Sequence, residues 1–382
     1  MKDKHFFKIL LVINLSIIFF IFFNKWPTLF YDLVTFFNGS KDELLGFNAY
    51  RSKELNFVYH PVILDFNLFL EQFRALQSFY ILSICSSFLL LIFSYKRYLK
   101  FYGMYNFKSF NILLGLFAYG FIFAELMVKM NISLLLNNII LSIILFDVTS
   151  PVRKNRVAYV GIVSILLFAI IKPYLLAYLI YFFLSRRALT LKVGIIAVPF
   201  FLGFFFPVSK ILYPEKYPLF MEALSRQTIN RPDGLIDVGF SYFGFLYRFL
   251  SAPLSFLGHG FIVSILILIY LRLRNFKLDT SGFDAPSSIF ILMLIIISLN
   301  PRMMVYDFFY ILLFIPCVIK VKSKLTLFVV VFCSLFITVG NYFQLSWSGS
   351  VQKVVWWAPV FYTLLSIIVK DLKLHLRSFT IT

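Results

Sequence analysis

Residues 168–187 read FAIIKPYLLAYLIYFFLSRR, a run that is apolar except for Lys172 and its two terminal arginines. The run has about the 20 residues that a helix needs to cross a bilayer. Pro173 nevertheless stands in its middle, and proline inside a helix removes a backbone donor and clashes with the preceding turn. We therefore predict two helices, 157–171 and 174–185, joined by a tight turn at Lys172 and Pro173.

Similar apolar runs recur along the whole chain, which is 61% hydrophobic and only 14% charged. A soluble protein needs more charge to cover its surface. The sequence predicts an all-α, polytopic integral membrane protein with about twelve transmembrane helices and both termini in the cytoplasm. We expect it in the inner (plasma) membrane. The predicted spans are 6–23, 77–95, 110–127, 132–147, 157–171, 174–185, 193–213, 255–271, 287–299, 305–319, 325–340 and 354–369.

The formal net charge is +19, and the location of the charges explains it. Basic clusters follow apolar runs in every second loop, which is the pattern of cytoplasmic loops in membrane proteins. This pattern excludes a nucleic-acid footprint, so we predict membrane lipids and no nucleic acid as partners. The clusters are Lys96-Arg97, Arg153-Lys154-Arg156, Arg186-Arg187, Arg272-Arg274-Lys277, Lys320-Lys322-Lys324 and Lys370-Lys373-Arg377.

This topology leaves two long segments, 24–76 and 214–254, outside the cytoplasm. Within the first, apolar residues recur at helical spacing from Val62 to Leu76, opposite a polar face. That pattern predicts a helix lying in the membrane interface or leading into the next span. A shorter helix of the same kind is predicted over 29–37.

Polar residues gather on the extracytoplasmic side, and Lys172 is among them. A lysine at a helix end commonly extends its ammonium group to the lipid headgroups. Alternatively, it binds an anion, because lysine and arginine near one membrane face can hold the phosphate of a lipid. No phosphate-loop, metalloprotease or nucleophile-elbow motif occurs, and the three cysteines form no CxxC pair. We predict neither a metal nor a cofactor.

These elements, taken in their order, resemble the GT-C superfamily of polyprenyl-phosphate-sugar-dependent glycosyltransferases. They are most similar to glycosyltransferase family 87, which contains polyprenol-phosphate-mannose-dependent mannosyltransferases. The resemblance extends over the whole chain, with an alanine in the family's "NPY" element and a histidine in its "YPP" element. The elements are Asp32, Asn48-Ala49-Tyr50, Tyr59-His60-Pro61, Lys172-Pro173, Phe240-Ser241, Pro301-Arg302 and Tyr306-Asp307.

The resemblance implies one transmembrane glycosyltransferase domain over 1–382, with 24–76 and 214–254 forming its active-site face. It implies transfer of mannose, or of another hexose or pentose, from a polyprenyl phosphate to a lipid-linked or glycan acceptor, with inversion. A carboxylate in the first outside loop is then the base. Asp32 fits best because it stands among aromatic residues, with Asp42 and Asp65 as competitors.

The same resemblance implies two groups of binding residues. Lys172 and Arg302 supply positive charge to the departing phosphate. For His60, orienting the substrate and serving as a satisfied interfacial histidine remain open alternatives. The implied substrate-binding residues are Asn48, Tyr50, Tyr59, His60, Lys172, Arg302, Tyr306 and Asp307.

Two other functions fit parts of the pattern. A polysaccharide polymerase or ligase acting on undecaprenyl-diphosphate-linked glycans would share the outside site, but such proteins usually carry a larger arginine-rich loop than 214–254. A transporter or flippase of lipid-linked sugars would need a polar path through the bilayer, and the predicted spans contain few polar residues at mid-depth.

Overall fold

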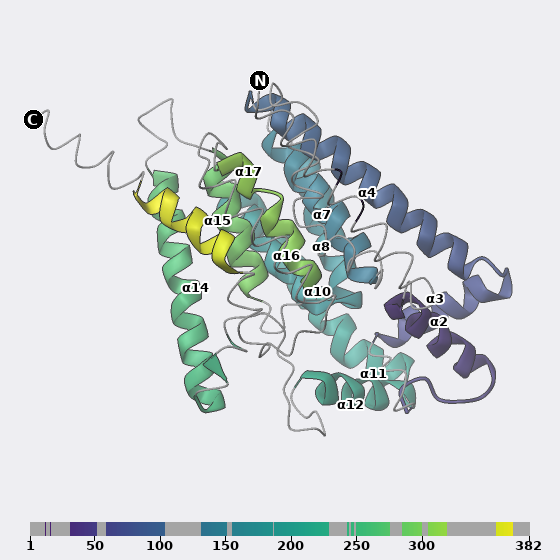
Figure 1. Cartoon of the computed structure of the whole chain (residues 1–382). Coiled ribbons are helices and arrows are strands. Elements are labelled where there is room, and N and C mark those ends of the chain that lie inside the picture. The colour runs from purple at the N-terminus through teal and green to yellow at the C-terminus, as the bar shows by residue number, and fades with distance from the viewer. Residues whose placement is uncertain are drawn as a thin grey trace, which may run out of the picture. The chain divides into compact units, whose positions relative to one another are not determined.

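In the part of the chain that it describes, the computed structural model consists of helices joined by turns and contains no strand (Figure 1). This confirms the predicted all-α class for those residues. The described residues are 12, 16, 31–51, 59–103, 131–150, 155–185, 187–228, 243, 246, 247, 250–275, 285–299, 305–318 and 357–369.

The chain forms two compact units, each built from segments that are distant in sequence. The first unit comprises 1–27, 104–125 and 238–382, and the second comprises 28–103 and 126–237. Most of the residues that the sequence singles out for the site belong to the second unit.

Helix packing in the second unit follows the predicted spans closely. The long helix α4 packs along α7, and α7 packs against α8 (Figure 1). The predicted spans 77–95, 132–147 and 157–171 correspond to these three helices. Their bounds are α4 Leu76–Phe101, α7 Ile132–Val148 and α8 Asn155–Ile171.

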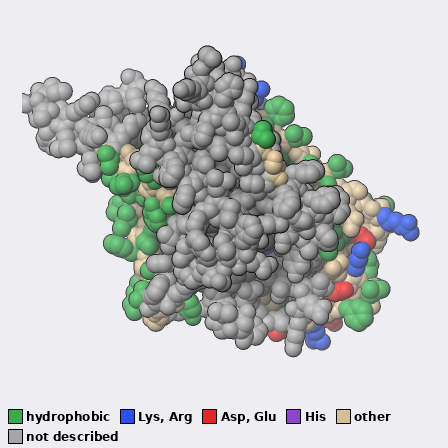
Figure 2. All heavy atoms as spheres, viewed as in Figure 1, with side chains coloured by type: hydrophobic (Ala, Val, Ile, Leu, Met, Phe, Trp, Pro, Cys, Tyr) green, Lys and Arg blue, Asp and Glu red, His purple; other side chains and the backbone are tan. Residues whose placement is uncertain are grey.

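Helix α4 places polar side chains inward and apolar side chains outward. Ser87 and Ser94 are buried, whereas Leu82, Leu89 and Phe93 are each more than half exposed. A helix in water shows the opposite distribution. In Figure 2, hydrophobic side chains also make up much of the described surface on the face shown. This face of α4 is therefore suited to contact with lipid.

Three helices in the described part of the chain are long and apolar enough to cross a membrane. They extend over Leu76–Phe101, Val193–Leu212 and Pro253–Arg272. Together with the exposed apolar face of α4, they indicate that the protein associates with membranes.

The predicted turn at Lys172 is present. Lys172 has an extended backbone (φ −138°, ψ 93°), and Pro173 begins a 3₁₀ helix, η3, over Pro173–Tyr178. Proline disfavours the helical conformation in the residue before it, so α8 ends here. Beyond η3 the chain continues as the short α9, Leu179–Ser185.

The predicted span 193–213 is helical but not uniform. It comprises α10 Arg187–Gly203, a π-helical turn η4 over Phe204–Val208, and α11 Ser209–Leu212. Pro207 lies inside the π-turn. Proline cannot donate the helical hydrogen bond, and a π-turn accommodates this interruption without ending the helix.

The described part of the segment 24–76 contains two helices, α2 Tyr31–Leu44 and α3 Pro61–Gln72. Helix α3 ends earlier than the predicted 62–76, because the chain turns before α4 begins. Arg74 makes this turn with a left-handed backbone, φ 53°. Its N–H and that of Ala75 bond back to carbonyls at the end of α3. In the second long segment, α12 spans Lys216–Thr228.

In the first unit, α14 and α15 pack together and cover the predicted spans 255–271 and 287–299. The predicted span 305–319 is divided at Leu313 and Phe314, just before Pro316. The bounds are α14 Ala252–Asn275, α15 Ala285–Ser298, α16 Val305–Leu312 and α17 Ile315–Val318. For the predicted span 354–369, residues 357–369 are described and helical. The predicted spans 110–127 and 325–340, and nearly all of 6–23, lie outside the described residues.

Candidate functional site

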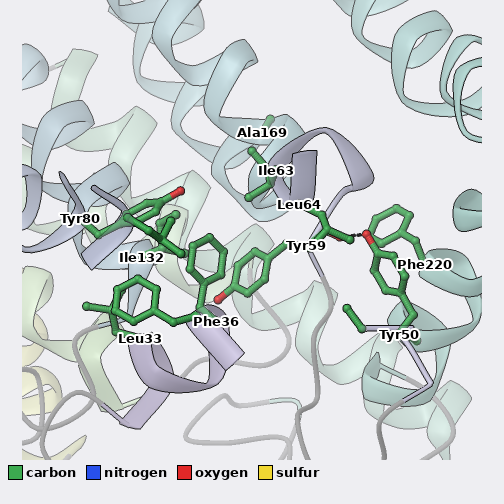
Figure 3. Close-up of a cluster of buried hydrophobic side chains, with 14 of the residues drawn as sticks. Leu33, Phe36, Tyr50, Tyr59, Ile63, Leu64, Tyr80, Ile132, Ala169 and Phe220 are labelled. Carbon is green, nitrogen blue, oxygen red and sulfur yellow. Dashed lines mark hydrogen bonds between the residues drawn. The ribbon is translucent and has the colours of Figure 1, made fainter. Parts of the chain in front are cut away.

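A cluster of buried hydrophobic side chains, many of them aromatic, joins the segment 24–76 to other helices of the second unit (Figure 3). The Phe36 ring on α2 meets the edges of Tyr59 and Tyr80, with centroid distances of 4.7 and 5.0 Å and an angle of 86° in both pairs. Edge-to-face contacts of this kind add to the stabilisation from burial. The cluster therefore fixes the backbone from which several predicted site residues project.

The element Asn48-Ala49-Tyr50 folds into this cluster as a tight turn. The Asn48 side-chain oxygen accepts a hydrogen bond from the Tyr50 N–H at 3.0 Å. The Tyr50 hydroxyl donates to the Tyr59 carbonyl at 2.8 Å, the bond drawn in Figure 3. Burial, followed by the negative charge of nearby Glu43, raises the pKa of Tyr50, so its hydroxyl stays a donor. The two predicted elements at 48–50 and 59–61 are thus directly bonded.

Lys172 reaches this cluster from the turn between α8 and η3. Its ammonium nitrogen lies 4.5 Å from the centre of the Tyr59 ring. A cation over an aromatic face is attracted by the negative charge above the ring. The next residues hold the turn in place, since the Asn137 amide on α7 donates to the Tyr174 hydroxyl at 3.1 Å. Lys172 is half-buried and lies beside Tyr59, which belongs to the predicted element Tyr59-His60-Pro61.

His60 is fully buried, and both of its ring nitrogens have partners. Nδ1 accepts the Val62 N–H at 3.2 Å and so caps the start of α3. Nε2 lies 2.8 Å from the Ser209 hydroxyl, which itself donates to the Phe204 carbonyl in the π-turn. The ring is therefore neutral with its proton on Nε2. Burial lowers the pKa of His60 to about 4. Of the two alternatives for His60, this geometry favours the structural one.

A chain of buried polar groups connects α2, α3 and α4. The Tyr80 hydroxyl donates to the side-chain oxygen of Asn67 at 2.8 Å, and the side-chain amide nitrogen of Asn67 donates to the Ser40 hydroxyl at 3.1 Å. Ser40 in turn donates to the Phe36 carbonyl at 3.3 Å. Buried polar groups that satisfy one another fix the relative positions of the helices that carry them.

Lys216 links the segments 24–76 and 214–254, a contact that the sequence did not predict. Its ammonium group pairs with Glu43 at 3.0 Å and with Asp65 at 3.4 Å. The Glu43 carboxylate also accepts the Ala49 N–H at 3.2 Å. Burial lowers the pKa of Lys216, but hydrogen bonds and charge from Glu43 and Asp65 outweigh it and raise the pKa overall. The segment around 48–50 is thereby tied to α12.

The three candidate bases differ in their surroundings. Asp32 lies in the first turn of α2, next to Leu33 in the aromatic cluster, and its side chain lies outside the described part of the structure. Asp65 is engaged by Lys216, whose ammonium nitrogen lies 3.4 Å from the carboxylate oxygen. Asp42 is half-buried near the end of α2.

The remaining predicted residues lie in the first unit or outside the described residues. Asp307 is buried in α16, Tyr306 is in the same helix without a described side chain, and Arg302 lies outside the described residues. Their roles stay predictions. Among the described residues, no group of three histidine, cysteine, aspartate or glutamate side chains is placed to hold a metal ion.

In its described part, the protein thus belongs to the class of all-helical proteins with membrane-length apolar helices. Comparison with known protein families, with characterised proteins and with solved structures gives no match to the chain.

Proposed function

We propose that the protein is a membrane glycosyltransferase that moves a sugar from a polyprenyl phosphate to a lipid-linked or glycan acceptor on the extracytoplasmic face. The observation that carries the proposal is the contact between Lys172 and Tyr59. These residues are 113 positions apart, and each belongs to a different element of the family resemblance. Tyr50, from a third element, bonds to the Tyr59 backbone.

The donor chemistry suits a cation held at this position. When a sugar leaves a polyprenyl phosphate, negative charge grows on the phosphate, and a fixed cation stabilises that charge. In this proposal Lys172 supplies it, because its ammonium group lies at the aromatic cluster. Arg302 is the second proposed cation.

The acceptor chemistry requires one base. The acceptor hydroxyl attacks the anomeric carbon, the bond from that carbon to the phosphate oxygen breaks, and a carboxylate takes the hydroxyl proton. Asp32 is the proposed base, since α2 brings its backbone to the cluster that contains Tyr59. One direct displacement inverts the anomeric configuration, whereas retention would require a second carboxylate as nucleophile.

Substitution of the proposed base tests the function. Purified protein in detergent is supplied with a short-chain polyprenyl-phosphate mannose and a lipid acceptor, and transfer is measured. Asp32→Asn should reduce the rate by about 10²–10⁴-fold, while Asp42→Asn, a change of the same kind on the same helix, keeps it. If Asp42→Asn or Asp65→Asn abolishes transfer and Asp32→Asn does not, the base is misassigned. If the wild-type protein transfers none of a panel of polyprenyl-phosphate sugars, the proposed function is wrong.

A further inference from the structure

Four exposed phenylalanines form one apolar edge where α3 turns into α4. Phe66, Phe69 and Phe73 follow each other at intervals of three and four residues, so they share one side of α3. Phe79 lies in the first turn of α4. The exposed fractions are 40%, 55%, 67% and 40% in chain order. We name these four residues the phenylalanine edge.

Ring contacts make the edge continuous. Phe69 and Phe73 are 5.2 Å apart between centroids, and Phe66 and Phe79 are 5.7 Å apart, in both cases edge to face. The second pair joins α3 to α4. A phenylalanine side chain offers roughly 200 Å² of surface, so the edge exposes about 400 Å² of aromatic surface. That area equals the largest apolar patch of many water-soluble monomers, and such patches usually mark contact sites.

The edge is distinct from the face by which α3 packs in the fold. Ile63, Leu64 and Asn67 occupy the buried face, which joins the aromatic cluster and the polar chain to Tyr80. Asp65, four residues before Phe69, borders the edge on the exposed side of the helix, where it meets Lys216. Helix α3 therefore has a buried core face and an exposed side, and on the exposed side the phenylalanine edge lies next to the charged Asp65.

The edge continues the lipid-facing surface of α4. Beyond Phe79, the exposed residues Leu82, Leu89 and Phe93 follow along the same long helix. Its 26 residues rise roughly 39 Å, which exceeds the roughly 30 Å of the hydrocarbon layer. The ends of α4 therefore reach the headgroup region. The phenylalanine edge begins at one of these ends, where the apolar faces of interfacial helices commonly carry phenylalanine.

We infer that the phenylalanine edge is a membrane-binding surface, inserted among the lipid acyl chains just below the headgroups. The occupant is the bilayer itself, because the edge is apolar and continuous with a membrane-length helix. Insertion fixes the depth of α3, while the ion pair between Asp65 and Lys216, which borders the edge, stays at the level of the headgroups. This inference does not depend on the proposed glycosyltransferase activity.

Spin labels at single cysteines test the inference in the full-length protein. Cysteines 85, 317 and 333 are first replaced, and Phe69→Cys, Phe73→Cys and Gln72→Cys are labelled in phosphatidylcholine vesicles. Gln72 is the matched control. It is exposed on the same helix, stands between Phe69 and Phe73 in the sequence, and lies on the side of Phe69 that is nearer to Asp65. Collision with oxygen, which concentrates among acyl chains, is compared with collision with a water-soluble nickel chelate.

The two phenylalanine positions should show an oxygen-to-nickel collision ratio several-fold above that of position 72. An oxygen-to-nickel ratio at positions 69 and 73 as low as that of a label in water would place the edge in water and overturn the inference. Low collision with both reagents at 69 and 73 would also overturn it, since the edge would then be covered by protein. Cysteine at an exposed position leaves the core face of α3 intact, so the labelled proteins should fold.

Discussion

The ammonium nitrogen of Lys172 lies 4.5 Å from the centre of the Tyr59 ring, across 113 positions of sequence. Tyr59 is itself fixed, because its ring contacts Phe36 and its carbonyl accepts the Tyr50 hydroxyl. The lysine that interrupts an apolar run is thus held by the segment 24–76. A cation positioned in this way differs from one that only extends toward headgroups.

Replacing Lys172 separates these two roles. Lys172→Met keeps the apolar stem and removes the charge, so donor affinity should fall about 10–150-fold, the equivalent of roughly 1.5–3 kcal/mol for a charge-assisted hydrogen bond. Lys172→Arg should retain part of the activity. Transfer is measured at varied donor concentration. If Lys172→Met leaves both donor affinity and maximal rate unchanged, the lysine is an interfacial anchor alone.

Protonation of His60 should destabilise the protein in acid. Its pKa is lowered to about 4 in the folded protein by burial, against about 6.5 in an unfolded chain. The unfolded state therefore binds more protons between pH 6.5 and 4. Stability should be full above pH 6.5 and fall as the pH drops toward 4, by up to about 3 kcal/mol.

His60→Asn provides the control for the acid effect. Asparagine also caps helices well, so it keeps a bond to the Val62 N–H but cannot be protonated. Thermal unfolding in detergent is followed from pH 7.5 to 4 for both proteins. The variant should have lost the part of the pH dependence that falls between 6.5 and 4. An unchanged profile would show that another group causes it.

The two ion pairs of Lys216 should contribute unequally. Glu43 is closer to the ammonium group, at 3.0 Å, and its side chain is 16% exposed, whereas Asp65 is at 3.4 Å and 46% exposed. Solvent weakens exposed pairs, which typically contribute 0.2–1 kcal/mol. Double-mutant cycles that combine Lys216→Met with Glu43→Gln or with Asp65→Asn should give the larger coupling energy for Glu43. A larger coupling energy for Asp65 than for Glu43 would contradict this prediction. A coupling energy that does not change when salt is added would contradict it as well.

Gly161 should not tolerate a side chain. A Cβ atom there would overlap the Phe182 ring on α9 and contact Ile143 on α7 at 3.1 Å. Phe182 is fully buried, so its ring has little room to move. Gly161→Ala should lower stability by about 1–3 kcal/mol.

Gly194 on α10 is the matched control, because nothing lies within 4 Å of an added Cβ there. Alanine favours helix over glycine by about 1 kcal/mol, so Gly194→Ala should be neutral or stabilising. Melting temperatures in detergent compare the two variants. Equal effects would show that the contact between α8 and α9 is looser than the structure has it.

Hydrophobic runs predicted helix positions well in regions where the packing environment stays the same along the whole helix. The predicted span 132–147 became α7, Ile132–Val148, and Pro173 ended α8 where expected. Local sequence was sufficient in these places, because one apolar run or one proline determines the result. The number of spans and their orientation stay predictions.

Contacts between distant segments were beyond sequence reasoning. Nothing near His60 indicates Ser209, which is 149 positions away, and nothing near Lys216 indicates Glu43. The π-turn at Phe204–Val208 was missed because a helix and a π-turn have the same apolar pattern. The one available signal was Pro207 inside a predicted span, which marks an interruption but not its form.

The π-turn also decides where this part of the chain can change its length. A π-turn holds one residue more than the α-helical turn that would replace it. Deleting Phe206 would remove that extra residue, so the residues before and after the turn would keep their positions around the helix and Ser209 would still face His60. Each residue of an α-helix turns by about 100°, so a deletion inside α10 would instead turn the Ser209 hydroxyl away from His60. A one-residue deletion would thus be tolerated at the π-turn and, when placed in α10, would be costly to α3.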